Sequence, residues 1–239
     1  MNTMLHDETG NRKITHLDSE LERLKSQIQE MGQLVQNQLK KSILAITRLD
    51  KDIAREVIFQ ERRVNAEELK IDRDCENIMA LFNPVAIDLR LVFATFKINS
   101  HLERIGDNAK GIARYAVEME RPYDPKLLED LRIKKMYEVA DSMIQDNLSA
   151  FAQSNGLLAR TIFTKDVLMD EINKHSDIVL SEYLKTHPEE SINALHMASV
   201  IHKLERIGDL NKNIAEEIIF YIEAKVLKHK HEKVIKGGN

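Results

Sequence analysis

The chain is 239 residues long, 31% of them charged and 43% hydrophobic, with 8 Gly, 4 Pro and no Trp; this composition is typical of long helices and excludes a turn-rich β protein. The formal net charge of −4 lacks the basic excess of a nucleic-acid-binding domain, so no nucleic-acid partner is expected. The single cysteine, Cys75, excludes an intrachain disulfide and favours a reducing compartment.

The first half of the chain predicts three long helices. Residues 1–15 are polar, lack the apolar stretch of a signal peptide, and are expected to be flexible. Apolar residues then recur every three or four positions, which predicts an amphipathic helix over about 17–50. A second helix is predicted over 51–81 and a third over 84–120. The two are separated at Asn83-Pro84, because the residue before a proline avoids the helical conformation.

The second half repeats this arrangement after a break at residues 121–125. Within the break, Asp124 is a candidate N-cap and Pro125 a candidate first helical residue. Helices are predicted over about 126–153, 157–185 and 189–225. The chain ends in a basic, glycine-containing segment, and residues 226–239 are expected to form a flexible tail.

A twelve-residue pattern occurs in both halves. Residues 102–113 read LERIGDNAKGIA and residues 204–215 read LERIGDLNKNIA, so nine of twelve positions are identical. A repeat of this size indicates internal duplication. We therefore predict an all-α protein of two tandem three-helix bundles, with six long antiparallel helices and domains over 16–121 and 122–225.

Each copy of the pattern contains two acidic residues four positions apart, Glu103 with Asp107 and Glu205 with Asp209. On an α-helix this spacing places both carboxylates on one face. Like charges in this arrangement destabilise a helix by roughly 0.2 to 0.5 kcal/mol, a cost that a bridging cation would reverse. Both pairs lie off the apolar stripe of their helix, so we expect them at the surface or in a groove.

A glycine lies inside each copy of the pattern, at Gly106 and Gly208. Glycine in a helix interior costs about 0.8 to 1.0 kcal/mol relative to alanine. The simplest explanation is that a neighbouring helix comes close to the backbone at this turn.

A metal ion needs more ligands than one carboxylate pair supplies, so the neighbouring helix must contribute. At corresponding positions, the second predicted helix offers Glu61 and Asn65, and the fifth offers Asp166 and Asp170. The sequence thus predicts one oxygen-rich site in each bundle, suited to iron, manganese, magnesium or zinc. The predicted ligands are Glu61, Asn65, Glu103 and Asp107 in the first bundle and Asp166, Asp170, Glu205 and Asp209 in the second.

A solvated helix surface is the alternative interpretation of any one acidic pair. We favour it for Glu68 and Asp72, which occur once. The repetition of the other pairs favours metal binding. No glutamate has a histidine three residues later, as di-iron bundle enzymes do, and no phosphate-binding glycine loop is present. A non-enzymatic protein is therefore expected, with a metal-dependent enzyme or metal-storage bundle as the alternative.

Three features together resemble the PhoU family of phosphate-transport accessory proteins. They are the two LERIGD segments, the stretch NPVAIDLR over residues 83–90, and Val64-Asn65. The resemblance implies a cytoplasmic protein of two three-helix bundles, often dimeric, whose E/D-x-x-x-D motifs hold surface metal clusters. Three of the acidic pairs match that motif, whereas Asn65 replaces its final aspartate with an amide.

The resemblance also implies a function. Members of the family restrain phosphate uptake and act as negative regulators of the phosphate-starvation response. They are thought to link the ATPase of the phosphate ABC transporter to the phosphate-sensing histidine kinase. Contact with the membrane would then be indirect, which agrees with the absence of an apolar stretch near the roughly 20 residues that span a bilayer.

Overall fold

The computed structural model describes residues 15–227. Within this range the chain forms seven α-helices and one short 3₁₀ helix, and no strand. The elements are α1 (His16–Arg48), α2 (Lys51–Phe82), α3 (Ala86–Glu118), α4 (Pro125–Asp130), α5 (Ile133–Ala152), α6 (Gly156–Thr186), η1 (Pro188–Glu190) and α7 (Ser191–Glu223). The predicted flexible tails, 1–15 and 226–239, lie outside the described residues except at Thr15, Val226 and Leu227.

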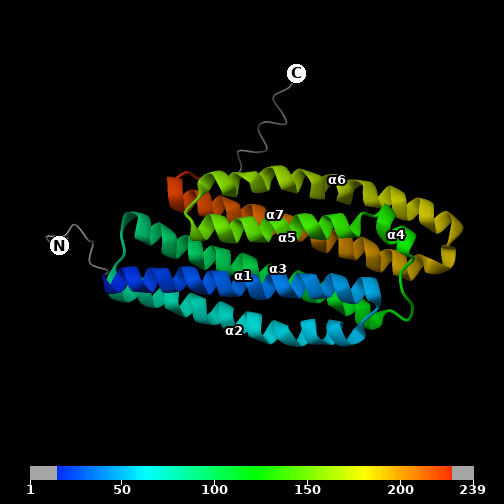
Figure 1. Cartoon of the computed structure of the whole chain (residues 1–239), viewed down its shortest axis with the longest axis horizontal. Coiled ribbons are helices and arrows are strands. Elements are labelled where there is room, and N and C mark those ends of the chain that lie inside the picture. The colour runs from blue at the N-terminus through cyan, green and yellow to red at the C-terminus, as the bar shows by residue number, and fades with distance from the viewer. Residues whose placement is uncertain (1–14, 228–239) are drawn as a thin grey trace, which may run out of the picture.

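The predicted all-α fold of two three-helix bundles is confirmed. Helices α1, α2 and α3 form one bundle and α5, α6 and α7 the other, with the long helices side by side along the longest axis of the molecule (Figure 1). Helix α3 also packs against α7, and α1 against α5, so these four helices are internal and α2 and α6 lie at the two edges. The buried apolar side chains of both bundles form one continuous core.

Polar side chains fix where the helices begin. Thr15 caps α1 in a reciprocal capping box, in which its hydroxyl accepts from the Asp18 N–H at 3.1 Å and the Asp18 carboxylate accepts from the Thr15 N–H at 2.9 Å. Asp50 caps α2 and Asn155 caps α6 through their side-chain oxygens, which accept from backbone N–H groups of the first helical turn. The expected cap at Asp124 is confirmed, with its carboxylate accepting from Lys126 N–H at 2.9 Å.

The prediction of one continuous helix over 126–153 is wrong. Helix α4 ends at Asp130 and α5 begins at Ile133, with Arg132 between them in the left-handed conformation at φ 54°. Leu131 and Ile133 are both buried, and in a continuous helix residues two positions apart point to nearly opposite sides. The break turns the chain so that both side chains reach the core.

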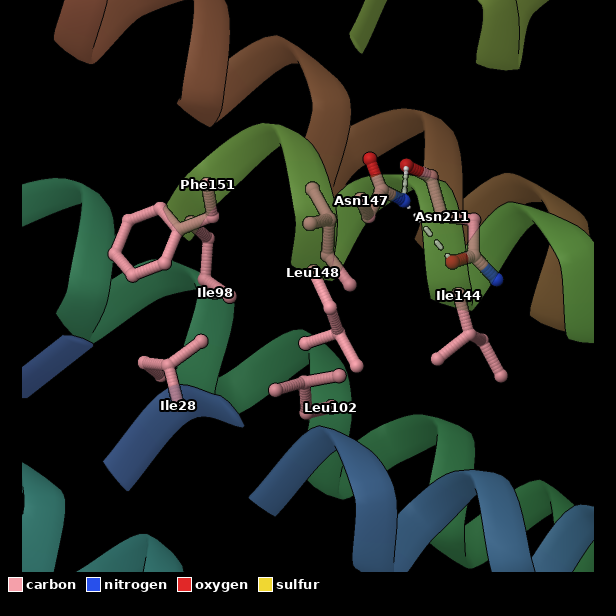
Figure 2. A pocket seen from close by; sticks show the side chains of 9 residues that line it. Ile28, Ile98, Leu102, Ile144, Asn147, Leu148, Phe151 and Asn211 are labelled. Atoms are coloured by element: carbon pink, nitrogen blue, oxygen red, sulfur yellow. Dashed lines mark hydrogen bonds between the residues drawn. The ribbon is translucent and has the colours of Figure 1, made fainter. Parts of the chain in front are cut away.

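The junction between the two bundles contains only a small cavity, of about 10 Å³. Figure 2 shows Asn147 and Asn211 on one side of it, facing aliphatic side chains that include Ile28 and Leu102. The Asn147 amide donates to the backbone carbonyl of Asn211 at 2.9 Å. A space of this size has room for one water molecule at most, so this cavity does not hold a ligand.

Among the helices of residues 15–227, none combines the length and the apolar character that a membrane-spanning helix needs.

Candidate metal centre

Helices α2 and α3 bring three of the predicted ligands together in the first bundle. Ligand oxygens of Glu61, Glu103 and Asp107 all lie within 4.8 Å of one another. Glu61 is buried at 4% exposure, Glu103 is half-buried, and the Asp107 side chain is 52% exposed. The group therefore opens from the bundle interior to solvent. It is the one set of three or more acidic, histidine or cysteine side chains in residues 15–227 whose ligand atoms converge in this way.

The fourth predicted ligand, Asn65, is exposed, and its place in the site stays a prediction. After Glu61 the buried stripe of α2 continues at Val64, three residues on, and Asn65 therefore points further outward. Asp72, from the acidic pair for which a solvated surface was favoured, accepts a hydrogen bond from the Asn99 amide at 2.9 Å. This hydrogen bond links Asp72 on α2 to Asn99 on α3.

The buried carboxylate of Glu61 has no hydrogen-bond donor at either oxygen. The nearest cation is Lys110, whose Nζ lies 3.6 Å from Glu61 Oε1 and 2.8 Å from Asp107 Oδ1. Burial raises the pKa of Glu61 to about 7. The charge of Lys110 opposes this rise, whereas the charge and side-chain hydrogen bond of Asp107 and the charge of Glu103 add to it. Partial burial also acts to raise the pKa of Asp107, but the hydrogen bond and charge of Lys110 bring it below its usual value.

These residues fit a divalent cation. An ionised carboxylate that is buried without a hydrogen-bond donor is costly, and Lys110 at 3.6 Å offsets this cost only in part, so a bound cation would supply further positive charge. The donor set consists of carboxylate oxygens alone, which suits hard or borderline ions. Glu61, Glu103 and Asp107 are the side chains that would hold the ion.

The second bundle places its acidic residues in the same way but fills the space between two of them. Asp166 on α6 is buried at 4% exposure, like its counterpart Glu61. Lys212 Nζ lies 2.6 Å from Asp166 Oδ2 and 2.9 Å from Asp209 Oδ1. Burial lowers the pKa of Lys212, but its hydrogen bonds to these two carboxylates outweigh burial and raise the pKa well above its usual value. An ammonium group thus occupies the position between the carboxylates.

Asp170 and Glu205, the remaining predicted ligands of the second bundle, are half-buried. Burial raises the pKa of Glu205, and the charges of Asp209, Asp170 and Asp166 add to that effect. The four acidic residues therefore lie near one another, but their centre already contains the positive charge of Lys212.

Lys110 and Lys212 were not recognised from the sequence. Both occur three residues after the aspartate, so LERIGD-x-x-K is repeated in full. A cation three residues beyond an acid on a helix is the ordinary pattern of a surface ion pair, and its repetition beside two carboxylates was the signal that could have identified these lysines as part of the site.

The two helix glycines permit close approach, as the sequence predicted. A Cβ on Gly106 would lie 3.0 Å from Gln38 Oε1, and one on Gly208 would lie 3.0 Å from Asp166 Oδ1. In each bundle a polar oxygen from a neighbouring helix is therefore seated over the glycine, next to the acidic pair.

Comparison with known proteins gives a consistent result. The family model described as "PhoU domain" matches twice, over residues 28–116 and 133–218. The phosphate-specific transport system accessory protein PhoU homolog of Aquifex aeolicus is 34% identical, over 91% of this chain and 97% of its own length. The Escherichia coli protein PhoU is also 34% identical, over 89% and 87%.

Solved structures agree. The crystal structure of PhoU from Pseudomonas aeruginosa superposes with a TM-score of 0.83 at 31% identity, covering 88% of this chain and all of that one. The phosphate transport system regulatory protein PhoU from Streptococcus pneumoniae superposes with a TM-score of 0.78 at 27% identity, covering 89% and 99%.

Proposed function

The chain belongs to the PhoU family, and on that premise we propose that it is a non-enzymatic accessory protein that regulates phosphate transport. The observation that carries the proposal is the double match to the family domain, together with similarity over nearly the whole length of relatives named phosphate-specific transport system accessory proteins. We also propose residues 16–121 and 122–225 as its two domains.

The proposed role is that of a cytoplasmic adaptor. The chain would link the ATPase of the phosphate ABC transporter to the phosphate-sensing histidine kinase, and so act as a negative regulator of uptake and of the starvation response. The two edge helices, α2 and α6, each carry a long exposed face that combines polar residues with exposed apolar ones such as Phe59 and Val167, and these faces would meet the partners. We further propose that the chain is a homodimer and reaches the membrane only through these partners.

Metal binding is the second part of the proposal. The first bundle would bind iron, manganese, zinc or magnesium through Glu61, Glu103 and Asp107, with Asn65 as the further predicted ligand, because the buried Glu61 carboxylate has no hydrogen-bond donor and Lys110 stays 3.6 Å from it. In the second bundle, Asp166, Asp170, Glu205 and Asp209 would bind an ion only after Lys212 is displaced. Two classes of site with different affinity follow, and metal would adjust the protein's contact with its partners.

Deletion of the gene tests the regulatory role. At high external phosphate we expect faster phosphate uptake and raised expression of starvation genes, both restored by the wild-type gene. Capture of partners from membranes, with and without phosphate, tests the adaptor role and should recover the transporter ATPase and the kinase. Unchanged repression after deletion would contradict the proposal.

A further inference from the structure

Gln38 is a buried polar residue without a partner. It lies on α1 with no exposed surface, and neither its Oε1 nor its Nε2 has a hydrogen-bond partner. Buried amides are almost always hydrogen-bonded, because an unsatisfied donor or acceptor costs free energy. An unsatisfied amide that persists in a core is therefore a candidate for a group that acquires its partner from a ligand or from a neighbour that changes state.

The packing of α1 against α2 places Gln38 at the level of Glu61. The two helices run antiparallel, and the ion pair Lys41–Glu56 and the hydrogen bond Gln27–Asp74 fix their alignment. Counting inward from these two contacts places residue 38 between the levels of residues 59 and 63. Glu61 and Gln38 are thus at one level of the first bundle.

Gln38 also reaches the helix that carries the other two acidic residues. Its Oε1 is the atom nearest to the Cβ position of Gly106, which directly precedes Asp107. The side chains of Gln38 and Val64 meet over this glycine. Gln38 thus lies at the level of Glu61 and next to the turn of α3 that carries Asp107, and its two polar atoms, like both oxygens of Glu61, have no hydrogen-bond partner.

The second bundle has no such amide. Each position in α1 and α2 matches the position 105 residues later in α5 and α6. Glu61 corresponds to Asp166 by this count. The contact of Lys41 with Glu56 likewise corresponds to that of Asp146 with Thr161. The counterpart of Gln38 is then Met143, a fully buried apolar residue. Over Gly208 the nearest atom is Asp166 Oδ1 itself.

We propose that Gln38 is a positioning residue that makes the first bundle the preferred cation site. When a cation binds, the Nε2–H group of Gln38 donates to the Glu61 carboxylate from the protein interior and holds it in the orientation that binds the ion. Carboxylates that bind metals are themselves commonly fixed by hydrogen bonds of this kind. This inference rests on the proposed metal binding and adds to it a residue that contributes no ligand atom.

The test is Gln38→Met, which installs the residue found at the corresponding position of the second bundle. Mn²⁺ binding to the full chain is measured by titration calorimetry, and urea unfolding of the metal-free protein is measured in parallel. We expect Mn²⁺ affinity at the tight site to fall by about 10- to 100-fold. The urea midpoint of the metal-free protein should stay the same or rise, because the variant removes polar atoms without partners.

The matched control is Met143→Leu, an apolar exchange at the equivalent depth, which should change neither quantity. A Gln38→Met variant that binds Mn²⁺ as tightly as wild type would overturn the role of Gln38 and leave the metal proposal intact. Failure of the wild-type chain to bind Mn²⁺ would overturn the metal proposal itself. Failure of both Gln38→Met and Gln38→Leu to fold would also overturn the inference, because the metal-free fold would then require the amide.

Discussion

The two bundles share a duplicated helix motif but neutralise their buried acid differently. In the second bundle, Lys212 contacts Asp166 at 2.6 Å. In the first, the equivalent Lys110 stays 3.6 Å from Glu61 and pairs with the exposed Asp107 instead. Duplication thus preserved the helical scaffold and both lysines, while the residues facing the motif from α2 and α6 diverged.

The helix that faces the repeated motif determines the chemistry of each site. The repeated segment supplies the same carboxylate pair and the same lysine in both halves. The neighbouring helix supplies either a glutamate without a donor or an aspartate that binds the lysine. The adjacent helix therefore decides whether a bundle is open to a cation or contains one of its own.

Replacing the two lysines should change the free energy of unfolding most, and by very different amounts in the two bundles. Lys212→Met leaves the buried Asp166 carboxylate without its partner. We expect the free energy of unfolding to fall by about 2 to 4 kcal/mol, which is less than for a fully buried pair because Lys212 is partly exposed. Lys110→Met should cost about 1 kcal/mol or less, since its close pair is with an exposed aspartate. Urea unfolding of both variants in EDTA measures the comparison, and equal losses would contradict it.

Neutral amides at the two buried acids should act in opposite directions. In metal-free protein above neutral pH, Glu61→Gln removes a buried charge that has no donor, and we expect a gain of about 1 to 2 kcal/mol. Asp166→Asn removes the charge that pairs with Lys212 and should destabilise the protein by a similar or larger amount. Thermal unfolding distinguishes these outcomes, and a loss of stability in both variants would show that Glu61 is already satisfied.

The stability of the protein should depend on pH through the buried Glu61 carboxyl. The pKa of Glu61 is raised from its ordinary 4.5 to about 7, so the folded state holds a proton that the unfolded state has released between these values. The Glu61 contribution to stability is therefore highest below about pH 4.5 and declines as pH rises toward 7. Between about pH 4.5 and 7, the free energy of unfolding of wild type should fall with rising pH relative to that of Glu61→Gln, which has no carboxyl group at this position. Parallel pH curves would be inconsistent with the raised pKa.

A smaller test concerns the helices that lead into the sites. Helix α1 is continuous, whereas its counterpart is divided into α4 and α5 at Arg132, which is left-handed. Arg132→Gly should raise the free energy of unfolding by about 0.5 to 1 kcal/mol because glycine adopts this conformation without strain. The control Glu138→Gly, at an exposed position in the interior of α5, should cost about 1 kcal/mol instead. A destabilising effect of both would argue for an unbroken helix.

Much of the fold could be read from the sequence because apolar periodicity and helix caps are local signals. The stripe from Leu21 to Ile46 and the cap at Asp124 needed no knowledge of neighbouring helices. The division at Arg132 was not predicted, because a two-residue spacing of buried apolar residues such as Leu131 and Ile133 also occurs inside a continuous helix, as at Ile43 and Ala45 in α1.

The candidate site was predicted less completely. Helical spacing of four grouped Asn65 with Glu61, but the stripe of α2 that meets α3 continues through Val64 and leaves Asn65 exposed. The carboxylate that each lysine contacts is determined by distances between two neighbouring helices. The side chains of Glu61 and Asp166, which face the lysines, differ in length by a single methylene group. Spacing along one helix carries no information about such distances.

Mn²⁺ titration calorimetry of two paired variants of the full chain determines which bundle holds the tight cation site. Glu103→Ala with Asp107→Ala removes the pair of the first bundle, and Glu205→Ala with Asp209→Ala removes that of the second. We predict that the first double variant loses the tight Mn²⁺ site and that the second retains it at wild-type affinity. Loss of the tight site in the second double variant, or its survival in the first, would contradict the claim that the first bundle is the open cation site.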